Sequence, residues 1–149
     1  MDKEYLDERL KELIDHALTT NNFEKFKIEE SLKDIFTNDD ITFVYPKNVF
    51  EEDAESRIFY VLHGEFFSEV KFEKDMRYVS TKPLEFEELR YAVQRKPERH
   101  GKGLEIVFSE EESYLLNSND DCIANWTETY SEYIGLIYAH LLEKKSLEE

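Results

Sequence analysis

The feature that most constrains the fold is a long apolar stripe near the C-terminus. Its members recur with the spacing of one helix face over about five turns. They are Ile123, Trp126, Tyr130, Tyr133, Ile134, Ile137, Tyr138, Leu141 and Leu142. Lys144 and Lys145 follow at the C-terminal end, where positive charge is favourable beside the helix dipole. A stripe this wide needs a large apolar surface to cover, and one face of a curved antiparallel sheet supplies it.

The middle of the chain contains the short segments from which such a sheet is built. These segments are rich in β-branched and aromatic residues and are bounded by turn-forming or polar residues. We predict strands at Ile41–Tyr45, Arg57–Leu62, Glu65–Phe72, Met76–Ser80, Phe86–Gln94, Leu104–Phe108 and Ser113–Asn117. Pro46 and Pro83 are expected to end strands, and His63-Gly64 is expected to form a tight turn. The spacing within Phe86–Gln94 also fits a helix, so strand and helix both stay open there.

The first 38 residues show helical periodicity instead. One face of a first helix carries Leu6, Leu10, Leu13, Ala17 and Leu18. A second helix is predicted over Glu24–Phe36. The chain is therefore expected to be an α+β protein. An N-terminal helical segment (1–38) precedes a bent antiparallel sheet, or partly open barrel, of about six to seven strands, and a long amphipathic helix caps it. We expect these parts to form one compact unit.

This order of elements resembles the pleckstrin-homology-like superfold, in which a C-terminal helix plugs one end of a bent antiparallel sheet. Three stretches resemble the later strands of bacterial members: Pro83–Leu89, Gly103–Phe108 and Ser113–Leu116. Trp126, early in the last helix, is also familiar from such domains. The resemblance covers residues 41–145 and implies a bacterial or phage protein. Lipid-binding members carry basic residues in the first inter-strand loop. The corresponding loop, Lys47–Ser56, is acidic here, so we do not expect phosphoinositide binding.

Charge and cysteine content narrow the classes of function. The net charge of −16 disfavours general affinity for nucleic acid or anionic lipid, because both reward positive surfaces. A single cysteine, Cys122, excludes an intrachain disulfide and favours a reducing compartment. The sequence begins without an apolar leader, and no apolar run approaches the length of a membrane span. We therefore expect a cytoplasmic protein that does not associate with membranes.

No motif for catalysis, cofactor binding or metal binding stands out. The four histidines (His16, His63, His100 and His140) lack the spacing of a helical zinc site. Acidic clusters such as Asn119-Asp120-Asp121 lack the glycine and the alternating ligands of a calcium loop, so we interpret them as solvated turns and caps. Cys122 is interpreted as a semi-buried packing residue. The sequence thus predicts a protein that is not an enzyme and needs no cofactor.

The best candidate site is a local reversal of charge between Arg90 and Lys102. This segment holds five basic residues against the single acid Glu98, a balance of +4, so the rest of the chain carries −20. The candidate partner-binding residues are Arg90, Tyr91, Arg95, Lys96, Arg99 and Lys102. Three interpretations stay open: a solvated loop that balances acidic neighbours, a contact with an acidic protein or a second copy, and a phosphate-binding patch.

Two functions fit these observations. The first is a non-enzymatic protein-interaction or regulatory module. In it the basic segment contacts a protein partner, and the N-terminal leucine stripe pairs with a second copy to give a homodimer. The second is an acidic inhibitor of the kind phages encode. Its carboxylates would imitate the phosphates of nucleic acid and occupy the basic groove of a host enzyme, with strong dependence on salt.

Overall fold

The computed structural model describes residues 4, 8, 11–12, 22–36, 41–51, 55–73, 78–96, 101–123 and 126–147. From Asn22 onwards the described residues form a helix, then seven strands with one 3-10 turn among them, and then a long helix. The elements are α2 (Asn22–Ile35), β1 (Ile41–Pro46), β2 (Ser56–His63), β3 (Phe66–Glu73), β4 (Val79–Glu85), η1 (Phe86–Glu88), β5 (Tyr91–Arg95), β6 (Gly103–Val107), β7 (Ser113–Asn117) and α3 (Thr127–Leu147). The predicted α+β class is confirmed.

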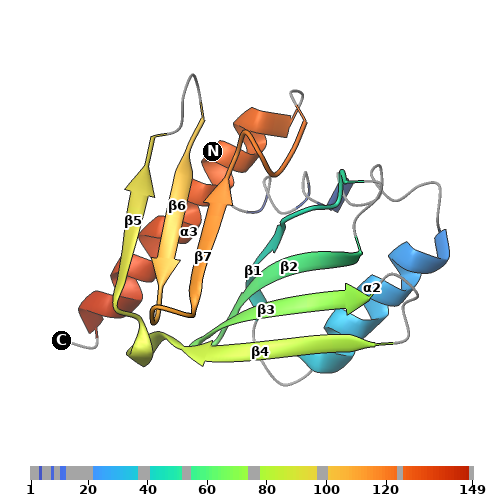
Figure 1. The fold of residues 1–149 in the computed structure, drawn as a ribbon, viewed down its shortest axis with the longest axis horizontal. Helices are drawn as coiled ribbons and strands as arrows, with labels where there is room; N and C mark the ends of the chain where they lie inside the picture. The colour runs from blue at the N-terminus through green and yellow to red at the C-terminus, as the bar shows by residue number, and fades with distance from the viewer. Residues whose placement is uncertain are drawn as a thin grey trace.

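The strands form two antiparallel sheets, with the orders β1-β2-β3-β4 and β5-β6-β7. Within each sheet, strands that follow one another in the sequence are paired, so each sheet is a simple meander. The strands of the two sheets run in different directions, and α3 lies behind β5–β7 (Figure 1). Among the described residues no strand pairing joins the two sheets, so the structure is not a closed barrel.

Aromatic side chains join the two sheets and α3 into one core. Tyr60 of β2 lies edge-on to Tyr114 of β7, with ring centroids 5.5 Å apart. Phe43 of β1 packs against Tyr133 of α3 at 5.4 Å in the same manner. Such edge-to-face contacts add to the free energy gained by burying the rings. The buried residues of α3 are Thr129, Tyr130, Tyr133, Ile134, Ile137 and Leu141, which confirms most of the predicted stripe. Ile123, predicted to belong to the stripe, precedes the helix and is 48% exposed.

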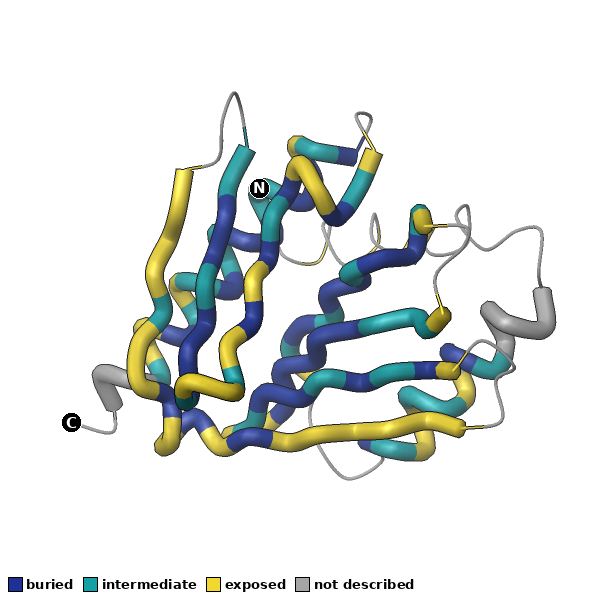
Figure 2. Tube along the Cα trace, in the orientation of Figure 1, coloured by how far each residue is buried: buried dark blue, intermediate teal, exposed yellow. Residues whose placement is uncertain are grey.

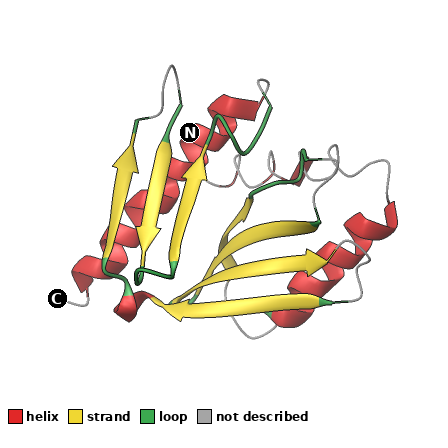
Figure 3. Cartoon of the chain, viewed as in Figure 1, coloured by secondary structure: helices red, strands yellow, loops and turns green. Residues whose placement is uncertain are grey.

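The central strands of the β1–β4 sheet, β2 and β3, are mostly buried on both faces because α2 covers the face that points away from β5–β7, whereas β4 is mostly exposed. Phe59 and Phe72 lie on this covered face, 5.7 Å apart. Phe36, directly after α2, packs on His63 of the same face at 4.4 Å. The position of α2 beside the sheet is visible in Figure 3, and the buried centre of β2 and β3 in Figure 2. The predicted helix over Glu24–Phe36 is thus confirmed, and it completes the core.

Two predictions about strand boundaries are wrong. Pro83 does not end a strand but lies inside β4, where it pairs with Ser68. Within the described residues β4 is an edge strand, and an edge position tolerates proline because its missing N–H is not needed by a second neighbour. The predicted segment Phe86–Gln94 is divided: its first part is the 3-10 turn η1, and the strand begins only at Tyr91. The predicted turn at His63-Gly64 is confirmed, with Gly64 at φ +52°, in the left-handed region that favours glycine.

Several predicted features lie wholly or partly outside the described residues. The leucine stripe of the first helix is one of them, so self-association through it stays a prediction. The described positions there (Glu4, Glu8, Lys11 and Glu12) are helical and exposed. The start of the predicted strand Met76–Ser80 and Arg99 of the basic segment are also not described.

Candidate partner-binding surface

The basic segment begins one residue before β5, which is the outer strand of its sheet. Within the described residues β5 pairs only with β6, so one side of its backbone has no neighbouring strand. Four of its five residues are exposed, and only Ala92 is half-buried, on the face that α3 covers. Figure 2 shows β5 as a mostly exposed strand beside the buried β6. An edge of this kind presents unpaired N–H and C=O groups to an incoming strand.

The structure divides the predicted basic group between the two ends of β5. Arg90 and Tyr91 lie at the beginning of the strand, where the Arg90 N–H donates to the Val107 carbonyl at 2.9 Å. Arg95 and Lys96 lie at its other end, about 17 Å away by the rise of an extended strand. Arg99 lies outside the described residues. Positive charge therefore flanks the strand and does not form one compact patch.

Lys102 is directed elsewhere. Its backbone N–H donates to the Ser118 hydroxyl at 2.8 Å, and its backbone carbonyl accepts from the Ser118 N–H at 3.0 Å. Its Nζ lies 2.9 Å from the position that a Cβ on Gly135 of α3 would occupy. The half-buried side chain thus reaches over the helix, with its Nζ next to Gly135. Lys102 is therefore held against α3 and is poorly placed to meet a partner of β5.

The side chains of β5 alternate, and one row points away from α3. Tyr91, Val93 and Arg95 form this outer row, and Tyr91 and Val93 are 49% and 38% exposed. Arg95 donates from Nε and Nη2 to the Glu105 carboxylate of β6, each at 2.9 Å. Leu115 of β7, 46% exposed, extends the row across the sheet. Exposed apolar side chains next to an open strand edge are suited to contact alternate residues of an added strand.

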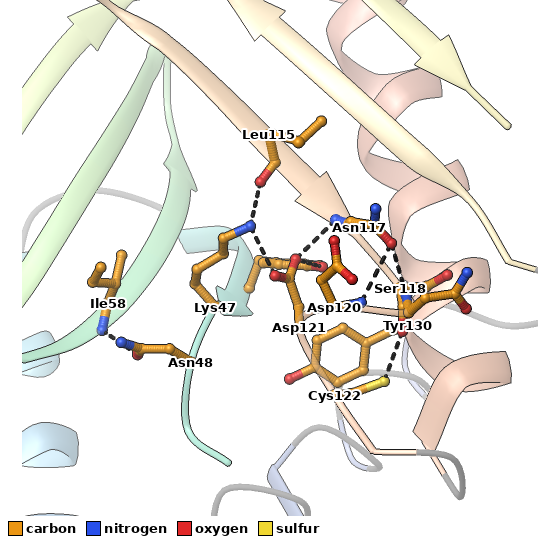
Figure 4. Close-up of polar contacts among 12 residues, drawn as sticks. Lys47, Asn48, Ile58, Leu115, Asn117, Ser118, Asp120, Asp121, Cys122 and Tyr130 are labelled. Carbon is orange, nitrogen blue, oxygen red and sulfur yellow. Dashed lines mark hydrogen bonds and ion pairs between the residues drawn. The ribbon is translucent and has the colours of Figure 1, made fainter. Parts of the chain in front are cut away.

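A second polar cluster joins the two sheets and was missed by the sequence analysis. Asp121, interpreted there as part of a solvated turn, is 4% exposed. Its carboxylate accepts hydrogen bonds from the Tyr45 hydroxyl at 2.5 Å and the Asn117 N–H at 2.8 Å, and it pairs with Lys47 Nζ at 2.7 Å. Lys47 also donates to the Leu115 carbonyl at 2.5 Å. Figure 4 shows Lys47 reaching from the end of β1 to the segment after β7.

Burial sets the protonation of this cluster. It raises the pKa of Asp121, although Lys47 and the hydrogen bonds to the carboxylate offset part of the effect. Burial and the nearby carboxylate raise the pKa of Tyr45 well above its usual value, so this phenol stays protonated and donates. Tyr130 of α3 is held in the same way and donates to the Pro46 carbonyl at 2.8 Å. The Asp121 carboxylate, the Lys47 ammonium group and the hydroxyls of Tyr45 and Tyr130 each have a partner inside the protein, which identifies the cluster as a structural joint.

Cys122, beside this joint, is a packing residue. Its thiol donates to the Ser118 carbonyl at 2.9 Å. Burial, with a smaller effect of Asp121, raises its pKa to about 11. Cys122 is half-buried and packs against the core, as predicted. A thiol with so high a pKa is also a poor nucleophile.

Comparison with protein-family models matches residues 6–132 to a family described as "Protein of unknown function (DUF3908)". The match spans most of the chain, from the N-terminal helical segment into α3. The chain belongs to the DUF3908 family. Neither the curated proteins nor the solved structures gave a match. Both the β5 edge and the Lys47–Asp121 pair lie inside the residues that DUF3908 covers, while the family description assigns no activity to either.

The described part of this DUF3908 protein contains no group of three or more His, Cys, Asp or Glu residues arranged to hold a metal ion. In the same residues no helix combines the length and the apolar character required to span a bilayer. What the described surface offers is the open, positively flanked edge of β5.

Proposed function

We propose that this protein is a non-enzymatic protein-interaction module and that β5 receives an extended, acidic segment of a partner as an added strand. The observation that carries the proposal is the edge position of β5, with exposed side chains and basic residues at both ends. Backbone hydrogen bonds to an added strand supply affinity, and the outer row of Tyr91 and Val93 supplies contacts to alternate side chains. Arg90 and Lys96 select for acidic residues in the partner.

The same charges oppose pairing of β5 with a second copy of itself. In an antiparallel pair centred on Val93, Arg90 of one copy would face Lys96 of the other, and like charges directly opposite destabilise a sheet. Basic residues at an edge are a common means of preventing self-association. An acidic segment removes this repulsion, so the edge favours it over a second β5.

The order of elements supports a pleckstrin-homology-like architecture as part of this proposal. A four-stranded meander, a three-stranded meander and a long helix follow one another in the described residues, as the resemblance implies. In this architecture β5 forms one border of the three-stranded sheet, and α3 fills its inner face. The helix α2, which precedes the resembling region, is an addition that covers the outer face of β1–β4.

The experiment titrates the full chain with a short peptide that alternates Glu with Val, and with the same peptide carrying Lys for Glu. We expect amide chemical-shift changes along β5 with the acidic peptide only, weakening as salt increases. Lys96→Glu should reduce the affinity by about five- to tenfold, because an attraction becomes a repulsion. Lys33→Glu, an exposed reversal on α2, changes the net charge equally and should leave binding unchanged.

Equal binding of both peptides, or shifts that avoid β5, would contradict the proposal. The nucleic-acid mimic makes a different prediction: binding to a cationic DNA-binding protein from which duplex DNA displaces it. That result, without peptide binding at β5, would replace the interaction module with the inhibitor.

A further inference from the structure

The helix α3 covers the inner face of the β5–β7 sheet unevenly. On this face β6 carries Leu104 and Ile106, which are both fully buried. The residues opposite them on β5, Gln94 and Ala92, are exposed and half-buried respectively. Figure 2 shows the same change from the buried β6 to the mostly exposed β5. The cover that α3 provides therefore ends at β5, which leaves a step between the open edge of the strand and the helix.

The two sides of α3 contact different parts of the molecule. On one side the Tyr133 hydroxyl accepts from the Val44 N–H of β1 at 2.9 Å. On the other side Gly135 lies next to Lys102 Nζ, which comes from the connection between β5 and β6. Positions 133 and 135 are about 200° apart around a helix with 3.6 residues per turn. One side of α3 thus faces β1, and the opposite side faces the border of the sheet that β5 forms.

Tyr138 and Leu142 lie on the same side of α3 as Gly135, because residues three or four positions apart are neighbours on a helix surface. Leu142 is 46% exposed, and Tyr138 is half-buried. Further along α3 the His140 ring lies 6.0 Å from the ring of Phe86 in η1, which precedes β5. The helix therefore follows β5 from the end of the strand back to its beginning, and this apolar pair lies along the step.

The backbone of β5 determines which side chains of an added strand meet this pair. Lys102, directly before β6, accepts from the Ser118 N–H, so by alternation the even-numbered residues of β6 bond to β7 and the odd-numbered ones to β5. Ala92 and Gln94, opposite even-numbered residues of β6, consequently direct their N–H and C=O groups to the open edge. Directly opposite residues share a face of the sheet, so the partner residues bonded there direct their side chains towards α3.

We propose that the partner strand is apolar on its α3-facing side and that its side chains opposite Ala92 and Gln94 fill the step against Tyr138 and Leu142. This inference rests on the proposed function and adds the pattern of the partner: acidic residues at both ends and large aliphatic residues at alternate positions between them. Leu142 is in water in the free protein, and covering it with an aliphatic side chain stabilises the complex.

Two seven-residue peptides with blocked ends and equal composition test this pattern. The inward peptide is Glu-Thr-Leu-Thr-Leu-Thr-Glu, and the outward peptide is Glu-Leu-Thr-Leu-Thr-Thr-Glu. With the terminal glutamates beside Arg90 and Lys96, the inward leucines lie opposite Ala92 and Gln94 in either strand direction. The leucines of the outward peptide then lie on the outer face. In amide-detected NMR titrations of the full chain, the inward peptide should bind about fivefold more tightly.

Three serine variants locate the contact. Leu142→Ser should weaken the inward peptide by about fivefold and leave the outward peptide unchanged, because only the inward leucines reach α3. Val93→Ser, on the outer face of β5, should weaken only the outward peptide. The matched control is Ile123→Ser, which changes a residue of similar exposure (48%) that precedes α3, and it should alter the binding of neither peptide.

The failures of the pattern and of the site are distinguishable. Binding at β5 that Leu142→Ser leaves unchanged, or weakens equally for the two peptides, would overturn the α3-facing pattern and retain β5 as the site. Equal or tighter binding of the outward peptide would have the same meaning. If neither peptide shifts the amides of β5, the proposed partner site itself is wrong, and the pattern falls with it.

Discussion

The outer faces of the two sheets differ although both sheets are antiparallel meanders of similar strands. The outer face of β1–β4 lies under α2, and Phe59, Val61 and Val70 on it are fully buried. The outer face of β5–β7 has no covering element among the described residues, and Tyr91 and Leu115 on it are about half exposed. Both faces carry apolar side chains, so composition alone does not tell them apart.

The difference shows that one helix determines which apolar face is core and which is surface. The apolar side chains under α2 gain free energy from burial, whereas those on β5–β7 would gain it only from a partner. Exposed apolar residues beside an open strand edge are therefore more informative about function than the larger apolar content of β2. The following predictions test this contrast, beginning with the largest expected effect.

Truncation under α2 should be the most damaging change. Phe59→Ala should lower the free energy of unfolding by about 3–5 kcal/mol, because it leaves a cavity beside Phe72. Val93→Ala, on the outer face of β5, should cost less than about 1 kcal/mol, since that side chain is already partly in water. Urea denaturation followed by circular dichroism measures both. Comparable losses for the two variants would show that the two faces are equally buried and would contradict the contrast.

The thiol of Cys122, at the junction of the two sheets, should react slowly with an alkylating reagent. Alkylation of Cys122 by iodoacetamide at pH 8 should be roughly two orders of magnitude slower than in the urea-unfolded chain. The reason is that only the thiolate reacts and the folded pKa is about 11, against roughly 8.5 for an unperturbed thiol. As pH rises from 8 to 10, the rate for the folded protein should increase about tenfold per unit. Saturation near pH 9 would contradict the raised pKa.

The next largest loss of stability is expected at the structural joint formed by Lys47, Tyr45 and Asp121. Asp121→Ala should lower the free energy of unfolding by about 2 kcal/mol, because the Tyr45 hydroxyl loses its acceptor in the core and Lys47 loses its countercharge. Asp121→Asn retains an acceptor oxygen and should cost less. Thermal unfolding of the two variants measures the order, and the reverse order would show that an acceptor oxygen at this position does not stabilise the joint.

The elements that the sequence predicted well are those decided by neighbouring residues. The strands around Leu104–Phe108 and Ser113–Asn117 and the turn at Gly64 follow from alternation and turn chemistry. Pro83 misled the prediction because the tolerance of a strand for proline depends on whether it lies at an edge, which is a property of the whole sheet. The pair of Lys47 and Asp121 joins residues 74 positions apart, and no local pattern contains that information.

In the basic segment, too, neighbouring residues determine the charge pattern, whereas the whole fold determines where each side chain lies. Part of the charge reversal lies on an edge strand, where basic residues are common, and its role in binding a partner stays a prediction. The charge pattern did not predict that Lys102 would pack on Gly135, or that Arg90 and Lys96 would lie at opposite ends of one strand. The positions of Arg90 and Lys96 depend on where η1 ends and β5 begins. The position of Lys102 depends on Gly135, the small residue on the facing side of α3.

The smallest expected effect is on the open edge. Arg95→Ala removes the ion pair with Glu105, whose side chains are 58% and 26% exposed, and should change the free energy of unfolding by less than about 0.5 kcal/mol. Added salt should reduce even this difference, because water and ions screen an exposed pair. The measurement is urea denaturation at low and high salt. A loss above about 2 kcal/mol would place Arg95 in a buried network. β5 would then not be an accessible edge, and the basis for adding a partner strand there would be removed.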